Sequence, residues 1–293
     1  MSNKIFHSIA ILGVGLIGGS LGLAVKAAGS VAEVRGWGRN SARLQRALDL
    51  GAVDTVTSDL AEVLHGVDCA IIATPTQHAE QLLLDTLSAA PDTTIISDVA
   101  SVKANLADAL QLAACAEAKK AQVVLAHPIA GSEQSGVEAA SATLFNDQRV
   151  ILTPLANTRP GAVDKVSALW RSVGAQLHSM DAELHDRVLG HTSHLPHVLA
   201  YALVDYLNRQ PESELMFTFA GGGFRDFTRI AASDPRMWRE ISLANREALL
   251  DALRGYQGQL QLMVDALENS DGDTLEASFG RAKTARDAFK PGE

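Results

Sequence analysis

Residues 10–22, AILGVGLIGGSLG, decide the fold that we predict for this chain. Gly13, Gly15 and Gly18 form a G-x-G-x-x-G pattern that follows an apolar run and opens a helix-like segment. In that setting the first glycine permits a tight turn, the second lets the backbone approach a pyrophosphate, and the third lets helix and strand pack closely. A plain turn would use the same glycines, but the flanking strand and helix favour an anion held by the N–H groups at the helix start.

Short apolar runs alternate with helix-like segments over the first 180 residues. The predicted strands cover 8–12, 33–37, 69–74, 94–99, 123–127, 149–154 and 175–180. The predicted helices cover 18–28, 40–50, 77–90, 101–117 and 160–173. Near-continuous hydrophobicity in the strands is typical of a parallel sheet that helices cover on both faces. The sequence therefore predicts a Rossmann-type, doubly wound α/β sheet over residues 1–180.

The strand pattern stops at Asp181. The segments 181–207 and 237–267 are long, amphipathic and helical in period. Helices this long and apolar seldom cover themselves, so we expect residues 181–293 to form an all-α domain through which the chain forms a homodimer.

Length and composition limit the class of protein. The 293 residues exceed one usual core, and 47% apolar with 20% charged residues is ordinary for a globular protein. The net charge of −9 argues against nucleic-acid binding, and no apolar run approaches the ~20 residues of a membrane helix. Two cysteines suit a reducing compartment. We expect a cytoplasmic protein that binds a small molecule but neither nucleic acid nor membrane.

The sequence after the second predicted strand bears on the choice of cofactor. An acidic residue about 20 positions after the glycines binds the ribose 2′-hydroxyl of NAD. Gly38 stands at that position and Arg39 follows it, so a 2′-phosphate would meet an arginine and no carboxylate. We predict NADP as the preferred cofactor, with NAD accepted if Arg39 is only a solvated loop residue.

The full set of predicted cofactor-binding residues includes a second turn. Residues 73–80 would flank the nicotinamide or serve as a plain turn. The predicted set is Gly13, Gly15, Leu16, Ile17, Gly18, Gly38, Arg39, Asn40, Thr74 and Pro75.

Two candidate catalytic side chains follow predicted strands. Ligands bind at the carboxyl ends of strands in open α/β sheets, and His127 in AHPIAGSEQSG stands at one of them. A histidine there is equally consistent with a packing residue. Ser101 would either cap the next helix or point into the crevice.

The helical half adds histidines and an arginine-rich loop. His191, His194 and His197 are spaced three apart, but we do not predict a metal site. Pro196 would interrupt the helix, and no acidic or cysteine partner has a matching spacing. Three glycines at 221–223 precede Arg225, Asp226 and Arg229, and an arginine fork suits a carboxylate.

Taken together, these stretches resemble the prephenate/arogenate (cyclohexadienyl) dehydrogenase family of tyrosine biosynthesis. The matching stretches are ILGVGLIGGSL, DVASVK, HPIAGSEQSG, SHLPH and GGGFRDFTRIAASDPRMW, in family order up to residue 238. The resemblance implies a Rossmann domain, a helical dimerisation domain and an active site between them. It implies oxidative decarboxylation of prephenate, and of arogenate as a further substrate, with hydride transfer to a nicotinamide.

The resemblance also implies residue roles. His127 would be the catalytic histidine, Ser101 would lie near the nicotinamide and the substrate hydroxyl, and Arg229 would hold a substrate carboxylate. The remaining substrate-binding residues would be His197, Ser132, Glu133, Gly222, Arg225, Asp226 and Trp238. A neutral His127 would accept a hydrogen bond from the substrate hydroxyl. Protonation of His127 at low pH would remove this acceptor, so we expect the activity of the enzyme to fall. Either Arg229 arrangement, on the ring carboxylate or on the side-chain carboxylate, fits the sequence.

Glu133 would pair with the ammonium of arogenate or remain a solvated loop carboxylate.

Two other functions compete with this one. A β-hydroxyacid or imine reductase also joins a Rossmann domain to a helical dimer domain, but the lysine typical of hydroxyacid dehydrogenases is missing from 181–207. A dinucleotide-sensing module would leave HPIAGSEQSG and GGGFRDFTR without a purpose.

Overall fold

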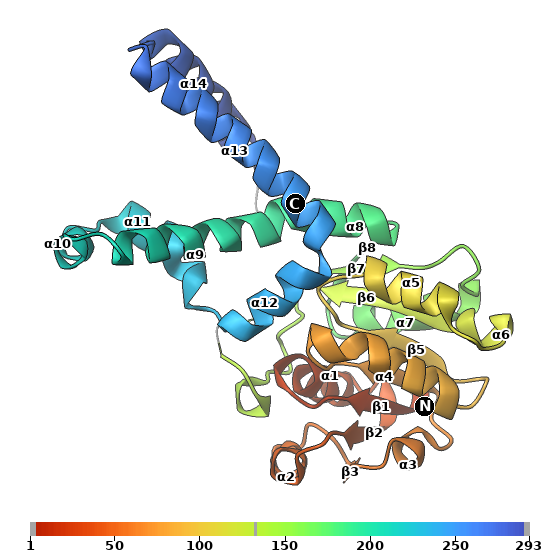
Figure 1. Cartoon of the computed structure of the whole chain (residues 1–293). Coiled ribbons are helices and arrows are strands. Elements are labelled where there is room, and N and C mark those ends of the chain that lie inside the picture. The colour runs from red at the N-terminus through yellow and green to blue at the C-terminus, as the bar shows by residue number, and fades with distance from the viewer. Residues whose placement is uncertain (1–3, 132–133, 290–293) are drawn as a thin grey trace.

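A strand-rich half carries a long helical arm in the computed structural model of the chain (Figure 1). The structure describes residues 4–131 and 134–289. A mostly parallel, Rossmann-like sheet with flanking helices comes first and an all-helical part follows, which confirms the predicted fold class.

The sheet has eight strands in the described part of the chain, in the order β3-β2-β1-β4-β5-β6-β7-β8. Adjacent described strands are parallel except β6 and β7. The strands are β1 (Phe6–Leu12), β2 (Val31–Trp37), β3 (Thr55–Thr57), β4 (Cys69–Ile72), β5 (Ile95–Asp98), β6 (Val123–Pro128), β7 (Arg149–Thr153) and β8 (Gln176–Ser179).

The expectation of a parallel strand at 149–154 was wrong, because β7 runs antiparallel to β6. A parallel neighbour needs a crossover connection, usually an α-helix. In its described residues the connection from β6 to β7 holds only the short 3₁₀ turn η1 (Val137–Ala139). The chain therefore turns back beside the strand that it has just left.

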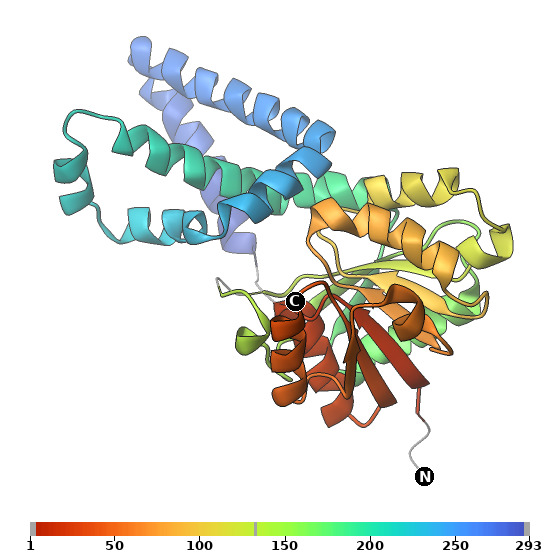
Figure 2. The same ribbon diagram turned by 60° about the horizontal axis from the view of Figure 1, so that its bottom comes forward.

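Helices cover both faces of the sheet (Figures 1 and 2). They are α1 (Leu16–Ala27), α2 (Ser41–Asp49), α3 (Leu60–Leu64), α4 (Thr76–Ala89), α5 (Ala104–Leu112), α6 (Glu117–Lys120) and α7 (Pro160–Ser172). The single helix predicted at 101–117 is therefore two helices, and the first begins three residues later than expected. The elements β3 and α3 went unpredicted because so few residues show no measurable period.

The strands bury side chains on both faces, which explains their near-continuous hydrophobicity. Ile9 and Ile11 of β1 face one apolar cluster, whereas Ala10 and Leu12 face the other. Trp170 of α7 and Phe145 meet edge to face in the first cluster, with ring centroids 5.2 Å apart. The sheet is thus a two-sided core on which the loops at its carboxyl edge are positioned.

The helical half begins with a helix that continues through Pro196. Its elements are α8 (Ala182–Leu189), the π-helix η2 (Gly190–His194), α9 (Leu195–Asn208), α10 (Ser213–Thr218), α11 (Gly222–Thr228), the 3₁₀ turn η3 (Arg229–Ala232), α12 (Pro235–Ala244), α13 (Arg246–Glu268) and α14 (Gly272–Ala288). The expected interruption at Pro196 was wrong. The N–H of Leu195 bonds to the oxygen of Gly190 across a wider turn, and this π-helical turn directly precedes Pro196, which has no N–H to donate.

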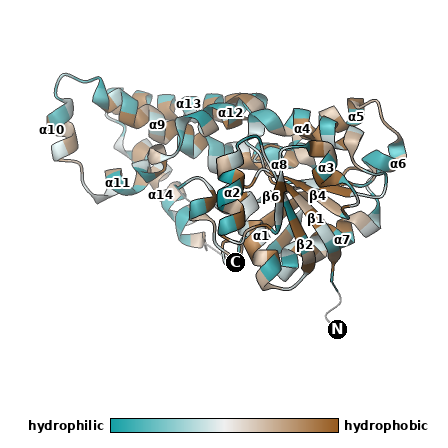
Figure 3. Cartoon of the chain, turned by 90° about the horizontal axis from the view of Figure 1, so that it is seen from below, coloured by the Kyte–Doolittle hydropathy of each residue, from teal (hydrophilic) through white to brown (hydrophobic). Residues whose placement is uncertain are grey.

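The arm exposes apolar side chains. Figure 3 shows brown, apolar segments along α9 and α13. Leu262 of α13 is 58% exposed and Tyr206 of α9 is 62% exposed. No helix in the described residues is both long and apolar enough to cross a membrane.

Candidate active site

The loops after β1 and β4 meet where the strand order reverses, the place at which open α/β sheets bind ligands. Gly13 has φ +107°, and a Cβ there would lie 2.7 Å from the oxygen of Ala73. A Cβ on Gly18 would lie 2.2 Å from the oxygen of Gly13. No described atom lies within 4 Å of the corresponding position on Gly15. Turn, open cradle and close helix–strand packing are therefore divided among the three glycines.

The cradle fits an anionic dinucleotide. Helix α1 begins at Leu16, and Ile17 follows in its first turn. This turn has no side-chain cap and no acidic residue, so its first N–H groups are directed at the open space beside Gly15. Oγ1 of Thr74, beside Gly13, is buried and has no hydrogen-bond partner among the described residues. Pro75 follows it at the start of α4. These residues leave backbone N–H groups and one hydroxyl for a ligand.

The predicted 2′-phosphate site has a different arrangement from the one expected. Nη2 of Arg39 lies 3.2 Å from Nε2 of His78 on α4, a residue that we did not predict. The side-chain oxygen of Asn40 accepts the N–H of Arg43 at 3.0 Å and so caps α2. Gly38 packs against Leu44. Arg39 is thus the residue of this turn whose side chain reaches across to the second loop.

His127 is buried near the carboxyl end of β6, and hydrogen bonds link its side chain to two others in a row. Its Nδ1 lies 2.8 Å from Nε2 of His185, and Nδ1 of His185 lies 2.7 Å from Oδ1 of Asp186. All three residues are buried. We did not predict His185 or Asp186, because two adjacent polar residues within a helical segment carry no signal of their partner 58 residues away.

Asp186 also caps a helix of the other half. Its carboxylate accepts the backbone N–H of Lys103 at 2.9 Å and that of Ala104 at 2.8 Å. Ser101, which we expected either to cap this helix or to face the crevice, makes no side-chain cap to α5. It lies half-buried in the bend between β5 and α5.

Lys103 ties this bend to the residue before His127. Its ammonium donates to the Asp98 carboxylate and, at 2.8 Å, to the oxygen of Ala126. Oδ1 of Asp98 accepts the N–H of Ala126 at 3.0 Å. Burial lowers the pKa of Lys103, and Asp98 opposes that shift. This ion pair lies in the quoted DVASVK stretch, but the sequence alone did not distinguish it from a surface pair.

The surroundings of His127 keep its ring neutral. Burial lowers the pKa of His127 well below 6.5, and the nearby His185, Lys103 and His194 lower it further. A neutral imidazole has one nitrogen that accepts a hydrogen bond. Because Nδ1 faces His185, Nε2 is the nitrogen that remains for a substrate.

The three histidines of the helical half have three different environments. His191 is exposed and bonds to the oxygen of Arg187. His194 is buried 3.0 Å from Nδ2 of Asn245, which also donates to the backbone oxygen of Asp186. The ring of His197 stacks on Trp238 with centroids 3.5 Å apart. His194 is therefore linked through Asn245 to Asp186, whereas His197 is only half-buried.

Trp238 links the predicted substrate residues to the sheet. It packs with Val102, the neighbour of Ser101, in a small apolar cluster. Burial lowers the pKa of His197, and the charge of Arg229 lowers it further. The turn η3, which begins at Arg229, packs against α9, the helix that carries His197. Val102, Trp238, His197 and Arg229 therefore follow one another along the junction of the two halves.

The other predicted substrate residues are not brought to this junction within one chain. Gly222, Arg225 and Asp226 are exposed on α11, which lies along the arm and away from β6 (Figures 1 and 2). Nε of Arg225 lies 3.7 Å from Oδ1 of Asp226. Ser132 and Glu133 lie outside the described residues.

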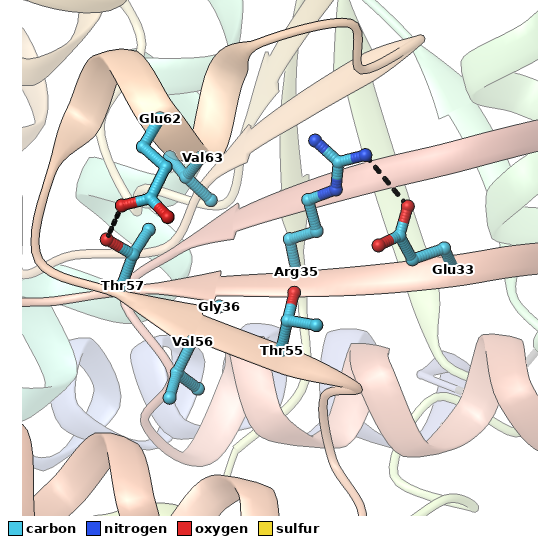
Figure 4. Close-up of a pocket in the computed structure, with 8 residues that line it drawn as sticks. All are labelled: Glu33, Arg35, Gly36, Thr55, Val56, Thr57, Glu62 and Val63. Carbon is cyan, nitrogen blue, oxygen red and sulfur yellow. Dashed lines mark hydrogen bonds and ion pairs between the residues drawn. The ribbon is translucent and has the colours of Figure 1, made fainter.

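A separate hollow of about 250 Å³ lies beside β2 and β3 (Figure 4). Its polar groups already pair: Arg35 donates to Glu33 at 2.9 Å, and the Thr57 hydroxyl donates to Glu62. It lies along β2 and β3 and includes none of the predicted site residues. We assign it no role in the active site.

Known families and structures match the whole architecture. The model for prephenate dehydrogenase, nucleotide-binding domain, matches residues 21–179, and that for prephenate dehydrogenase, dimerization domain, matches 181–281. The cyclohexadienyl dehydrogenase of Zymomonas mobilis is 35% identical over 289 residues, covering 98% of this chain and 97% of that protein.

Two solved structures extend the comparison. The prephenate dehydrogenase of Aquifex aeolicus, in complex with hydroxyphenyl propionate and NAD+, has a TM-score of 0.88 at 34% identity, over 98% of this chain and 99% of that chain. Synechocystis arogenate dehydrogenase has a TM-score of 0.82 at 26% identity, over 97% of this chain and 100% of that chain.

The buried neutral histidines predict how stability depends on pH. Burial lowers the pKa of His194 to about 4 and that of His127 well below 6.5. Between about pH 6.5 and 4 the unfolded chain binds protons at these histidines that the folded chain does not, so the free energy of unfolding falls as pH falls. Each group contributes at most about 1.4 kcal/mol per pH unit.

Urea unfolding between about pH 7 and pH 5 tests this dependence. His194→Gln should flatten the slope of the free energy against pH, whereas His191→Gln, on an exposed ring, should leave the slope as it is. Equal slopes for His194→Gln and the unaltered chain would contradict the prediction.

Proposed function

The chain belongs to the prephenate dehydrogenase family, as its motifs predicted, and from this we propose that it oxidises prephenate to 4-hydroxyphenylpyruvate in tyrosine biosynthesis. Arogenate, which would yield tyrosine, is the second substrate in this proposal. The observation that carries it is the buried, neutral His127 at the sheet edge that also bears the glycine cradle. A nicotinamide bound in that cradle would supply the hydride acceptor.

The chemistry demands little of the protein beyond placement and one acceptor. Hydride leaves C4 of the prephenate ring, the ring carboxylate departs as CO2, and the ring becomes aromatic. Nε2 of His127 accepts a hydrogen bond from the C4 hydroxyl and raises the electron density at C4 as the hydride leaves. Positioned help of this kind contributes about 10²–10⁴-fold to rate. Ser101, half-buried in the bend between β5 and α5, would lie beside the hydroxyl and the nicotinamide.

Arg229 and the His197–Trp238 stack orient the substrate from the helical half. We assign Arg229 to the side-chain carboxylate of prephenate. A tight grip on the departing ring carboxylate would stabilise the substrate more than the transition state, and only differential binding accelerates the reaction. The proximity of Arg229 to His197 supports this placement at the junction.

Turnover with four cofactor–substrate pairs tests the proposed activity. Purified protein should reduce NADP or NAD with prephenate, and more slowly with arogenate, as followed by nicotinamide absorbance. His127→Asn should lower kcat by about 10²–10⁴-fold. The acidic fall in kcat/KM should lie below pH 6.5, because His127 accepts a hydrogen bond only while it is unprotonated.

The control for this assay is His191→Asn, which alters an exposed histidine of η2 and should leave kcat unchanged. If no pair turned over while the cofactor still bound, the reductase and dinucleotide-sensing alternatives would take precedence.

We propose NADP as the preferred cofactor. Gly38 brings no carboxylate to the ribose, and Arg39 with His78 offers nitrogen donors between the second strand and α4. Arg39→Ala should raise KM for NADP about tenfold or more and leave KM for NAD unchanged, since a hydrogen bond to a charged group is worth about 1.5–3 kcal/mol. Initial-rate kinetics with both cofactors provide the measurement.

Arg46→Ala is the matched control for Arg39→Ala. Arg46 belongs to α2 and lies 3.8 Å from Glu138 in an exposed pair, so its loss should change neither KM. Faster turnover with NAD than with NADP in the unaltered protein would overturn the proposed preference.

We propose that residues 1–180 form the cofactor domain and residues 181–293 the substrate and dimerisation domain of a cytoplasmic homodimer. The match to a dimerization domain at 181–281 and the exposed apolar side chains of α9 and α13 support a second copy as the partner of this surface. The free thiols of Cys69 and Cys115 suit the reducing cytoplasm.

Light scattering after size exclusion should give twice the 31.0 kDa of one chain. Leu262 of α13 is 58% exposed, and Leu262→Glu places a charge on this apolar surface. The variant should shift the mass toward one chain. Leu112→Glu, on the 85% exposed end of α5, should leave the mass unchanged. A single-chain mass for the unaltered protein would contradict the dimer.

A further inference from the structure

The hydrogen bonds around His127 determine which of its nitrogens carries the hydrogen. From the direction of these bonds we propose that His185 and Asp186 are positioning residues that hold His127 in the tautomer with Nε2 unprotonated. This inference deepens the proposed function and rests on it, because the unprotonated Nε2 is the atom that accepts the substrate hydroxyl.

Asp186 determines which group donates in the hydrogen bonds that link it to His185 and His127. A carboxylate only accepts hydrogen bonds. Its oxygens accept the N–H groups of Lys103 and Ala104 at the start of α5, where the positive end of the helix favours a negative charge. Oδ1 lies 2.7 Å from Nδ1 of His185, so this nitrogen donates and carries the hydrogen.

The direction passes from one ring to the next. We assign a neutral ring to His185 as well. A neutral imidazole has one donor and one acceptor nitrogen, so with Nδ1 as the donor the Nε2 of His185 is an acceptor. It faces Nδ1 of His127 at 2.8 Å, and that nitrogen must therefore donate. Since burial keeps His127 neutral, its Nε2 has no hydrogen and can accept one from a substrate.

The other charged and titratable groups near His127 reinforce this state. Lys103, which precedes α5, and His194 of η2 both lower the pKa of His127. The ammonium of Lys103 is itself directed to Asp98 and to the oxygen of Ala126. Asp186 is the carboxylate that lies beyond His185, with Oδ1 2.7 Å from Nδ1 of that ring.

Three variants separate tautomer control from a structural role. In Asp186→Asn, the amide oxygen can keep the N–H groups of α5 while the NH2 group donates to Nδ1 of His185. Each hydrogen bond then reverses, His127 carries its hydrogen on Nε2, and kcat should fall at least about 10²-fold with KM within about threefold. His185→Leu, which offers no acceptor, should show a similar loss in kcat.

His185→Gln is the conservative variant that should rescue activity. Its side-chain oxygen can accept Nδ1–H of His127 and so preserve the tautomer, and kcat should stay within about tenfold of the unaltered enzyme. Asp181→Asn is the matched control, because Asp181 caps the same helix α8 by accepting the N–H of Leu184 at 2.7 Å and its side chain makes no hydrogen bond to the network within the described residues. Its kcat should not change.

Ring ¹⁵N NMR of histidine-labelled protein tests the inference without any substrate. His127, assigned by comparison with His127→Asn, should show the hydrogen on Nδ1, and Asp186→Asn should move it to Nε2. A hydrogen on Nε2 in the unaltered protein, or an unchanged tautomer in Asp186→Asn, would overturn the inference. Failure of the proposed function would instead appear as absent turnover with the predicted tautomer in place.

Discussion

The carboxylate of Asp186 is the group on which the rest of the site depends. It belongs to the helical half, yet its hydrogen bonds are made to the start of α5 in the sheet half and to its own neighbour His185. A buried carboxylate is costly unless its oxygens are satisfied, so the two halves are held in the one arrangement that satisfies them. That arrangement also brings His185 to His127. The joint between the halves and the orientation of His127 are therefore set by the same side chain.

A second buried charge fixes the other side of His127. Lys103 pairs with Asp98 and bonds to Ala126, so hydrogen bonds join the end of β5, the start of α5 and the residue before His127. Removing one partner of a buried pair costs about 3–5 kcal/mol, so folding depends on both members of this pair. By contrast, the apolar contact between the halves near Val102, Trp238 and Ile241 is small. Directional polar bonds determine how the halves meet, and apolar packing contributes area without direction.

The sequence predicted what depends on local pattern and missed what depends on distant partners. The glycine spacing and the apolar runs predicted the sheet, and the strand end together with the family resemblance predicted His127. The reversal of β7 was missed because a strand's direction depends on its connection and not on its composition. His185 and Asp186 were missed because their partners lie 58 and 83 residues away, and nothing within a helical stretch reveals them. The Lys103–Asp98 pair spans only five residues, but the sequence alone does not show that the pair is buried.

The charges of the site make sense together if the substrate is a dianion. An anion beside His127 would favour protonation of the ring and remove the acceptor that the proposed reaction needs. Burial and the charge of Lys103 oppose protonation of His127, and burial and the charge of Arg229 oppose protonation of His197. In a chain of net charge −9, positive groups gathered at this junction would also attract the substrate that they must counterbalance. Under the proposed function, cations near the histidines thus serve both binding and the maintenance of a neutral acceptor, because a dianion without them would raise the pKa of the group it meets.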